Sequence, residues 1–356
     1  MYKSKLEQFY KDRKVLITGH TGFKGAWMCM LLNTLGAKVS GYALNPPTTP
    51  SLFDICNIAN IVESIEGDIR DLKHLSEVFE KIRPEIVIHM AAQPIVRESY
   101  DNPVLTYETN VMGTVNVLEC CRFCDSVKSI VNVTTDKVYY NDERNIGFVE
   151  TDFLDGYDPY SNSKSCSELV THSYFNSFFS NLNIPVSTCR AGNVIGGGDF
   201  AKDRIVPDAI RAFENGQELI VRNPNSIRPY QHVIEPLVAY LLIAMKQTED
   251  NSIAGAYNIG PKPENCVTTE TLANLLCSEW GQVSWKSLND NGPHEANFLK
   301  LDSNKIKNVL GFESKWNMTE TVKKIIEVEK ARVNGSLGDE IRTIMRRHIE
   351  EYIRLC

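Results

Sequence analysis

Near its start the chain reads Lys14-Val15-Leu16-Ile17-Thr18-Gly19-His20-Thr21-Gly22-Phe23-Lys24-Gly25, and the architecture follows from this segment. A short apolar run comes first, which is typical of a buried parallel strand. Three glycines then follow at the spacing G-x-x-G-x-x-G. Apolar residues continue at helical spacing over residues 23–35 and stop at Gly36. A strand, a glycine turn and a helix in this order predict a dinucleotide-binding unit.

Each glycine has a physical task in such a unit. The first permits a tight turn, the middle one lets a pyrophosphate approach the backbone, and the last lets the helix pack closely on the strand. The N-terminus of the helix adds N–H donors and the positive end of a dipole. The expected cofactor loop consists of Gly19, Thr21, Gly22, Phe23, Lys24 and Gly25. The alternative is an ordinary turn, because glycines serve turns as well.

The residues after the second expected strand select neither NAD nor NADP. That place reads Ser40-Gly41-Tyr42-Ala43-Leu44, without the carboxylate that often binds the NAD ribose and without an arginine for a 2′-phosphate. Asp68 and Ile69, after the third strand, are the expected adenine contacts. The alternative for Asp68 is a helix cap.

Strand and helix patterns alternate over about the first 190 residues. Strands are expected at residues 14–18, 38–42, 61–66, 85–90, 129–133 and 185–190, and helices at residues 23–35, 72–81, 104–122 and 160–179. This alternation predicts an α/β fold with a doubly wound parallel sheet of the Rossmann type.

The alternation of strand and helix patterns weakens after Arg190, where glycines, prolines and polar residues become more frequent. We expect residues 1–190 to form the dinucleotide-binding domain. Residues 191–356 are expected to form mainly a smaller, partly interleaved substrate-binding region, with some segments returning to the first domain. An amphipathic pattern over residues 337–353 predicts a final helix that docks on the body of the protein rather than on a partner.

Composition excludes several classes of protein. The net charge of -7 makes a broad nucleic-acid-binding surface unexpected. No apolar run of about 18 residues is present, so no membrane span is expected, and the first residues do not resemble a secretory signal. Ten cysteines in 356 residues fit a reducing cytoplasm. Cys120, Cys121 and Cys124 lack a second ligand pair, so they are expected to be packing residues and no metal site is expected.

Two groups of residues point to catalysis. Tyr160 and Lys164 lie one helical turn apart, and a nearby ammonium favours the phenolate that takes a hydroxyl proton during hydride transfer. Thr135, Asp136 and Lys137 follow the fifth strand at its carboxyl end, where open α/β sheets bind ligands. Thr135 is expected to bond a sugar hydroxyl, Asp136 to act as an acid and Lys137 as a second acid or base; the alternative is a polar turn.

These motifs resemble the nucleotide-sugar branch of the extended short-chain dehydrogenases, over nearly the whole chain. Its 4,6-dehydratases usually carry Thr-Asp-Glu where this chain has Thr135-Asp136-Lys137, and the lysine is similar to that of the CDP-glucose 4,6-dehydratases. Other segments that carry the resemblance are Gly19–Gly25, Asn110-x-x-Gly113-Thr114, Gly41-Tyr42-Ala43-Leu44, His89-Met90-Ala91-Ala92-Gln93-Pro94, Arg228-Pro229-Tyr230-Gln231-His232-Val233 and Pro293-His294-Glu295-Ala296.

The resemblance implies an NAD-dependent, redox-neutral dehydration of CDP-glucose to CDP-4-keto-6-deoxyglucose. Tyr160 takes the proton of the 4-hydroxyl as hydride leaves C4. Lys137 then takes the C5 proton, Asp136 protonates the departing 6-hydroxyl, and hydride returns to C6. A lysine base must lose its charge through burial or a nearby cation. Alternatively, Lys137 stays charged and polarises the ketone.

The resemblance also implies further contacts. Ala91, Ala92 and Gln93 are expected at the cofactor, and the expected substrate contacts are Glu98, Asn193, Arg204, Val221, Arg228 and His294. Surface ion pairs are the alternative for the two arginines. The competing functions are a nucleotide-sugar 4-epimerase, a dehydratase of GDP-, UDP- or dTDP-sugars, and a non-catalytic cofactor-binding protein. By analogy with related enzymes, a homodimer or higher homo-oligomer is expected to form through the helices at residues 104–122 and 160–179.

Overall fold

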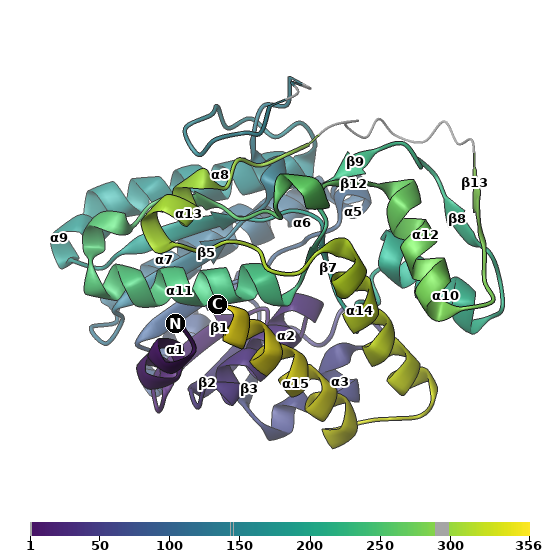
Figure 1. Cartoon of the computed structure of the whole chain (residues 1–356). Coiled ribbons are helices and arrows are strands. Elements are labelled where there is room, and N and C mark those ends of the chain that lie inside the picture. The colour runs from purple at the N-terminus through teal and green to yellow at the C-terminus, as the bar shows by residue number, and fades with distance from the viewer. Residues whose placement is uncertain (1, 143, 145, 289–298) are drawn as a thin grey trace.

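The computed structural model describes residues 2–142, 144, 146–288 and 299–356, and a parallel sheet runs through their centre (Figure 1). In this part of the chain the sheet has seven strands in the order β11-β6-β5-β4-β1-β2-β3. The strands are β1 (Lys14–Thr18), β2 (Lys38–Ala43), β3 (Glu63–Glu66), β4 (Ile86–His89), β5 (Ser129–Val133), β6 (Val186–Arg190) and β11 (Ala256–Asn258). All of their pairings are parallel. The predicted α/β fold is confirmed.

Helices cover both faces of this sheet. The α-helices are α1 (Tyr2–Tyr10), α2 (Phe23–Thr34), α3 (Leu52–Ile55), α4 (Leu72–Ile82), α5 (Val96–Asp101), α6 (Pro103–Tyr107), α7 (Gly113–Phe123), α8 (Pro159–Tyr174), α9 (Ser180–Leu182), α10 (Ile205–Glu214), α11 (Ile234–Glu249), α12 (Thr269–Trp280), α13 (Asn304–Leu310), α14 (Met318–Val333) and α15 (Asp339–Leu355). Short 3-10 helices are η1 (Ile58–Asn60), η3 (Asp136–Val138), η5 (Asn251–Ile253) and η6 (Pro263–Asn265), and π-helical turns are η2 (Glu108–Met112) and η4 (Phe175–Phe179).

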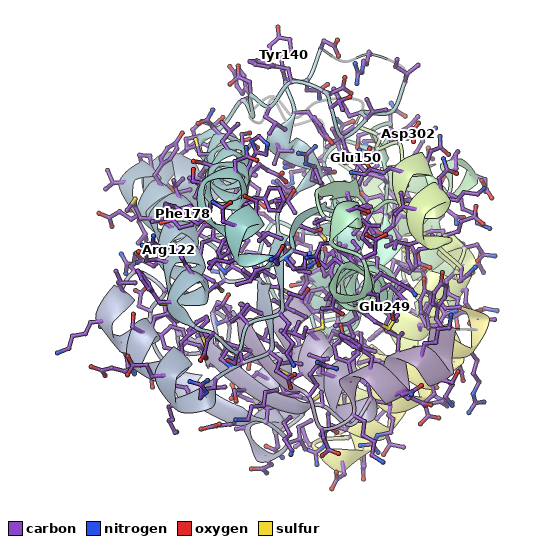
Figure 2. All side chains as sticks on the ribbon, turned by 90° about the vertical axis from the view of Figure 1, so that its left-hand side faces the viewer. Arg122, Tyr140, Glu150, Phe178, Glu249 and Asp302 are labelled. Carbon is purple, nitrogen blue, oxygen red and sulfur yellow. The ribbon has the colours of Figure 1, made fainter. Side chains whose placement is uncertain are left out.

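Side chains alternate between two cores because successive strand residues point to opposite faces. Val15 and Ile17 belong to a core shared with α2, α11 and α15. Leu16 belongs to the opposite core, shared with α4 and α7. On the outer surface of this second face of the sheet, the Arg122 guanidinium lies over the rings of Phe123 and Phe178. Figure 2 labels Arg122 and Phe178.

Segments after Arg190 serve both the sheet and a separate cluster. β11 pairs with β6, α11 packs on β5, and α15 packs on α2. A third core instead joins α10, α12 and α14, which lie to one side of the sheet in Figure 1. Three short pairs complete the structure: β7 (Val194–Ile195) with β10 (Gln231–His232), β8 (Leu219–Val221) with β13 (Trp285–Ser287), and β9 (Ile227–Arg228) with β12 (Val267–Thr268).

Several element boundaries differ from the expectation. The helix predicted at residues 104–122 begins at Pro103 and widens into the π turn η2, and the one predicted at residues 160–179 contains η4. The final helix begins at Asp339, so Leu337 lies outside it and is exposed. Within the described part of the chain, no helix has the length and apolar character needed to cross a lipid bilayer.

Candidate active site

The glycine loop leaves no room for side chains at two of its three glycines. Gly19 has φ of +79°, and a Cβ there would lie 2.7 Å from the Ala91 nitrogen. A Cβ on Gly25 would lie 2.2 Å from the Gly19 carbonyl oxygen, so the helix packs directly on the turn. Gly22 caps α2 without a side-chain hydrogen bond. The first N–H groups of this helix are therefore available to a phosphate, and the loop fits a dinucleotide.

The carboxyl ends of β2 and β3 border this loop. The Thr21 hydroxyl donates to the Leu44 carbonyl oxygen at 2.9 Å. Asp68 pairs with Arg70 at 2.6 Å; partial burial opposes its ionisation, but Arg70 holds the pKa of this carboxyl below its usual value. Asp71 accepts from the His74 N–H and caps α4, so the alternative cap role of Asp68 is wrong. The adenine contact of Asp68 and Ile69 stays a prediction.

The segment after β4 is fixed by its own amide groups. The Gln93 N–H donates to Asn110 Oδ1 at 2.8 Å, and its side-chain amide donates to Thr106 at 2.9 Å. Asn110 in turn donates to Ser163 of α8 at 2.9 Å. These bonds hold Gln93 in the loop, and they tie the loop to α8, the helix that carries the predicted catalytic tyrosine. Ala91 and Ala92, just before it, are partly buried.

Tyr160 and Lys164 lie on α8, whose first turn is capped by Asp158. Both side chains are buried, at 9% and 4% exposure. The Lys164 amine donates to the Val133 carbonyl oxygen at 3.1 Å. Burial lowers the pKa of Lys164 to about 8, and it raises the pKa of Tyr160 to about 12 against the effect of a hydrogen bond with Thr135. Burial therefore favours the neutral form of both groups.

Asp136 lies just beyond β5, in the 3-10 turn η3, and its carboxyl group is almost fully buried. Thr135 donates to its Oδ1 at 3.0 Å, while its Oδ2 has no hydrogen-bond partner among the described residues. Burial raises the pKa of Asp136, opposed by the charges of Lys137 and Arg228. The backbone of Gly192 makes space for this carboxyl, since a Cβ there would lie 1.7 Å from Oδ2. Such a group suits a proton donor.

Lys137 follows in the same turn, and its side chain is exposed. The described residues therefore do not bury its amine. Lys24 projects from the first turn of α2 toward the interior, with its amine 3.4 Å from the Tyr240 hydroxyl. Burial lowers the pKa of Lys24 to about 8, and the charges of Lys164 and Arg204 act in the same direction. Lys24, Lys164 and Arg204 thus form a group of cations around the predicted catalytic residues.

The predicted substrate contacts lie in the segments after β6. Arg204 forms an ion pair with Asp199 at 3.0 Å, and its charge also acts on Tyr160. Asn193 has φ of 44°, a left-handed conformation directly after Gly192. Arg228, in β9, acts electrostatically on Asp136.

Three predicted contacts remain, and the structure describes two of them. Val221 is buried in β8, and its carbonyl oxygen accepts from the Leu288 N–H at 3.0 Å. Glu98 is exposed on α5 and accepts from Asn102. His294 lies outside the described residues.

Comparisons with known proteins agree with this geometry. The model of the family described as GDP-mannose 4,6 dehydratase matches residues 16–325. The chain belongs to this family. The CDP-glucose 4,6-dehydratase of Salmonella typhimurium is 46% identical over 354 residues, which cover 98% of each chain. The resemblance read from the motifs is therefore confirmed.

Solved structures of other proteins share the fold. The dTDP-glucose 4,6-dehydratase of Bacillus anthracis, in complex with NAD, superposes with a TM-score of 0.74 at 20% identity over 92% of this chain and 99% of its own. The UDP-glucose 4-epimerase of Thermus thermophilus, also in complex with NAD, gives 0.76 at 24% identity over 91% and 99%.

Some residues of the site could not be found by sequence reasoning. Gly192 and its approach to Asp136 have no local signal, because they come from different strands. Glu168 follows Lys164 by four residues and so shares its helix face, and this spacing was the one available clue. Its carboxylate forms a buried ion pair with Arg190 at 2.8 Å.

Proposed function

We propose that this chain is an NAD-dependent CDP-glucose 4,6-dehydratase. The observation that carries the proposal is the Asp136 carboxyl, a buried acid with a free oxygen next to the Tyr160–Lys164 pair and followed by Lys137. Tyr160 and Lys164 serve hydride transfer in many reactions, whereas elimination of water needs an additional acid. The 46% identity with a CDP-glucose 4,6-dehydratase over nearly the full length supports this choice of reaction and nucleotide.

The cofactor side is formed by the glycine loop and the ends of the neighbouring strands. Gly19, Gly22 and Gly25 shape a turn that admits a pyrophosphate, and N–H groups at the start of α2 bond it. Further residues of this side are Thr21, Phe23, Lys24, Asp68, Ile69, Ala91, Ala92 and Gln93. When bound, NAD accepts hydride from C4 of the sugar and returns it to C6.

Tyr160 acts on the sugar 4-hydroxyl. Burial holds its phenol in the neutral form, so a positive charge is needed for it to accept a proton. Lys164, one helical turn away, supplies that charge and is itself directed by the Val133 carbonyl oxygen. Thr135, bonded to both Tyr160 and Asp136, orients the two groups toward the same sugar.

Asp136 and Lys137 perform the elimination. The ketone formed at C4 acidifies the C5 proton, Lys137 removes this proton, and Asp136 gives its own to the 6-hydroxyl, which leaves as water. As hydride returns to C6, Lys137 gives a proton back to C5. The Lys137→Met variant tests the base role, because methionine keeps much of the length but carries no amine. It should retain C4 oxidation and lose deuterium exchange at C5 in D2O. Undiminished exchange would show that Lys137 only polarises the ketone.

The substrate side is assigned to the region after residue 190. We place Asn193, Arg204 and Arg228 at the diphosphate, since arginine binds such groups through paired hydrogen bonds. Arg204 already has Asp199 as a partner, so substrate binding has to compete with or extend this ion pair. We assign Val221 to the nucleotide base and Glu98 to the sugar; His294 lies outside the described residues.

One screen tests the function and its alternatives together. CDP-, dTDP-, UDP- and GDP-glucose and GDP-mannose are incubated separately with the protein, and the products are read by mass spectrometry and by the configuration at C4. Loss of one water from CDP-glucose alone is the expected result. Inversion at C4 without water loss would identify an epimerase, and no turnover of any sugar nucleotide would favour a non-catalytic cofactor-binding protein.

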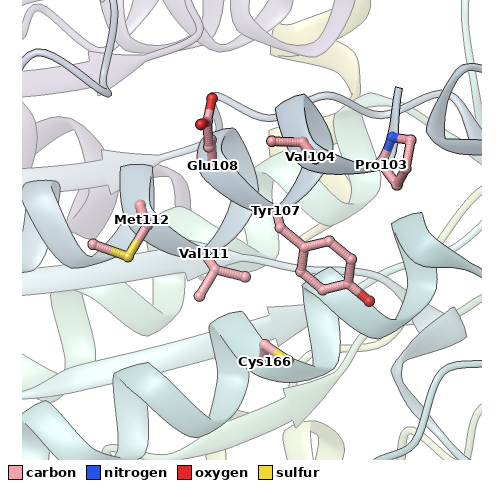
Figure 3. Close-up of a pocket in the computed structure, with 7 residues that line it drawn as sticks. All are labelled: Pro103, Val104, Tyr107, Glu108, Val111, Met112 and Cys166. Atoms are coloured by element: carbon pink, nitrogen blue, oxygen red, sulfur yellow. The ribbon is translucent and has the colours of Figure 1, made fainter. Parts of the chain in front are cut away.

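We also propose a homodimer that forms through the outer face of α6, η2 and α8. Val104, Met112 and Leu169 are exposed on these helices although they are apolar. A pocket of about 440 Å³ lies on the same face and contains none of the predicted catalytic residues (Figure 3). Apolar area of this kind is typical of interfaces. Val104→Glu with Met112→Glu should lower the mass in analytical ultracentrifugation; an unchanged mass would contradict this interface.

A further inference from the structure

Three consecutive residues at the end of β5 are each bonded by a side chain from one face of α8. The pairs are Lys164 with the Val133 carbonyl oxygen at 3.1 Å, Glu168 with the Thr134 hydroxyl at 2.5 Å, and Tyr160 with Thr135. Residues 160, 164 and 168 share a helix face because they are spaced by four. Strand end and helix are therefore held in one register directly before the predicted acid, Asp136.

Glu168 is the most heavily bonded member of this face. Its carboxylate is 4% exposed, and each of its oxygens accepts two hydrogen bonds. Oε1 accepts from Thr134 and from Arg190 Nε at 3.0 Å. Oε2 accepts from Thr188 at 2.6 Å and from Arg190 Nη2 at 2.8 Å. Four hydrogen bonds to a buried carboxylate fix it in place.

Arg190 extends the network across the carboxyl end of the sheet. Its Nη1 donates to the Tyr139 hydroxyl at 2.7 Å and to the Glu150 carbonyl oxygen at 2.9 Å. Tyr139 donates to Asn258, at the end of β11, at 2.6 Å. Figure 2 shows Glu150 near the end of the molecule where Tyr140 and Asp302 also lie. Tyr139 directly follows η3, so the network encloses the Asp136 turn from both sides.

We infer that Glu168, held by Arg190, is a positioning residue for the proposed dehydration. It fixes the helix that carries Tyr160 and Lys164 against the end of β5, and its negative charge favours the protonated Lys164 amine. The effect on turnover rests on the proposed function, whereas the effect on Lys164 does not.

The groups around Lys164 determine whether loss of the Glu168 charge raises or lowers the pKa of its amine. Lys24 from α2 and His89 from β4 also interact electrostatically with its amine, and Tyr160 lies one helical turn before it on α8. Burial lowers the pKa of Lys164 to about 8, and the Glu168 charge opposes this shift. Loss of that charge therefore lowers the pKa of Lys164 further, and more of the amine is neutral at neutral and alkaline pH.

The experiment compares wild-type protein with Glu168→Gln by two measurements. First, the protein is labelled with ¹³C at lysine Cε, and the Lys164 signal is assigned by its loss in Lys164→Arg. NMR spectra over a pH series then give the titration midpoint of this signal. We expect the midpoint to fall by about one pH unit, which makes the neutral fraction about tenfold larger relative to the charged one. Second, kcat with CDP-glucose should fall progressively more in the variant as the pH rises, by up to about tenfold.

Two control variants separate a positioning role of Glu168 from a general disturbance of the structure. Glu235, on α11, is another buried carboxylate, which accepts from the Lys315 and Trp316 N–H groups at 3.0 and 2.8 Å. Glu235→Gln should leave the Lys164 midpoint and the shape of the pH profile unchanged. Thr134→Val removes one bond to Glu168 but keeps the charge, so it should lower kcat equally at every pH.

The outcomes distinguish the two proposals. An unmoved Lys164 midpoint in Glu168→Gln, or a loss of kcat that is the same at every pH, would overturn the role of Glu168. A moved midpoint in a protein whose wild type does not dehydrate CDP-glucose would overturn the proposed function alone. If Glu168→Gln does not fold because Arg190 is left unpaired, Glu168→Gln with Arg190→Gln removes both charges of this pair, and the same two measurements decide.

Discussion

Gly192 gives a test of the predicted acid that leaves the carboxyl group itself unchanged. A Cβ added at this position would lie 1.7 Å from Asp136 Oδ2, and side chains essentially never approach a Cβ closer than 3.0 Å. Gly192→Ala therefore has to displace the carboxyl by at least 1.3 Å, the difference of these two distances. A misplacement of about 1 Å costs a reaction step roughly 100-fold, or about 2.7 kcal/mol in its barrier.

The loss should fall on elimination rather than on C4 oxidation. In a single turnover with CDP-glucose, the absorbance of reduced nicotinamide reports oxidation, and mass spectrometry reports the loss of water. We expect Gly192→Ala to form the reduced cofactor at a rate close to that of wild type and to release water about 100-fold more slowly. Gly260→Ala is the matched control, because a Cβ there meets nothing closer than 3.4 Å and should change neither rate.

A double variant completes the test. If Gly192→Ala acts only by moving the carboxyl, adding it to Asp136→Ala should cause no further loss. Water release at the wild-type rate in Gly192→Ala would refute the placement of the acid. An equal loss of both steps would show that the substitution disturbs Tyr160 through Thr135, not the acid alone.

Three other predictions follow from the described contacts. Tyr160→Phe should abolish turnover while leaving cofactor binding measurable by calorimetry; unchanged turnover would refute the proposed mechanism. Burial lowers the pKa of His89 to about 3, so the folded state binds fewer protons than the unfolded state between about pH 3 and 6.5 and stability falls with falling pH. Between pH 7 and 5 this residue alone should lower the free energy of unfolding by about 2 kcal/mol. In denaturation experiments at both pH values, His89→Gln should reduce the difference in unfolding free energy by that amount. Asp71→Ala removes the cap of α4 and should cost about 1 kcal/mol in urea unfolding; no loss would mean that the bond to His74 contributes nothing.

The sequence was most informative where one residue pattern maps onto one local structure. Buried parallel strands are continuous apolar runs, so β1 and β5 were predicted at their observed bounds. The glycine loop was predictable because the spacing of its glycines follows from steric demands within seven residues. For the same reason, the Tyr160–Lys164 spacing placed both groups on one buried helix face.

Contacts between segments far apart in the sequence could not be predicted from local residue patterns. β11 has the sequence Ala-Tyr-Asn, which carries no strand pattern, and only its pairing with β6 makes it a strand. The ion pair of Glu168 with Arg190 joins a helix to the end of a strand, and no periodicity indicates that two charges will be buried together. The π turns η2 and η4 also escaped prediction, because their residues keep a helical pattern.

The late arrival of β11 and α15 in the chain has a consequence for synthesis. The edge of β6 stays uncovered until residues 256–258 have left the ribosome, and α2 lacks its covering helix until α15 follows. In the folded protein α15 also contacts α1, the first helix of the chain (Figure 1). A nascent chain stopped after β6 presents a bare strand edge and an open apolar face, both of which promote aggregation.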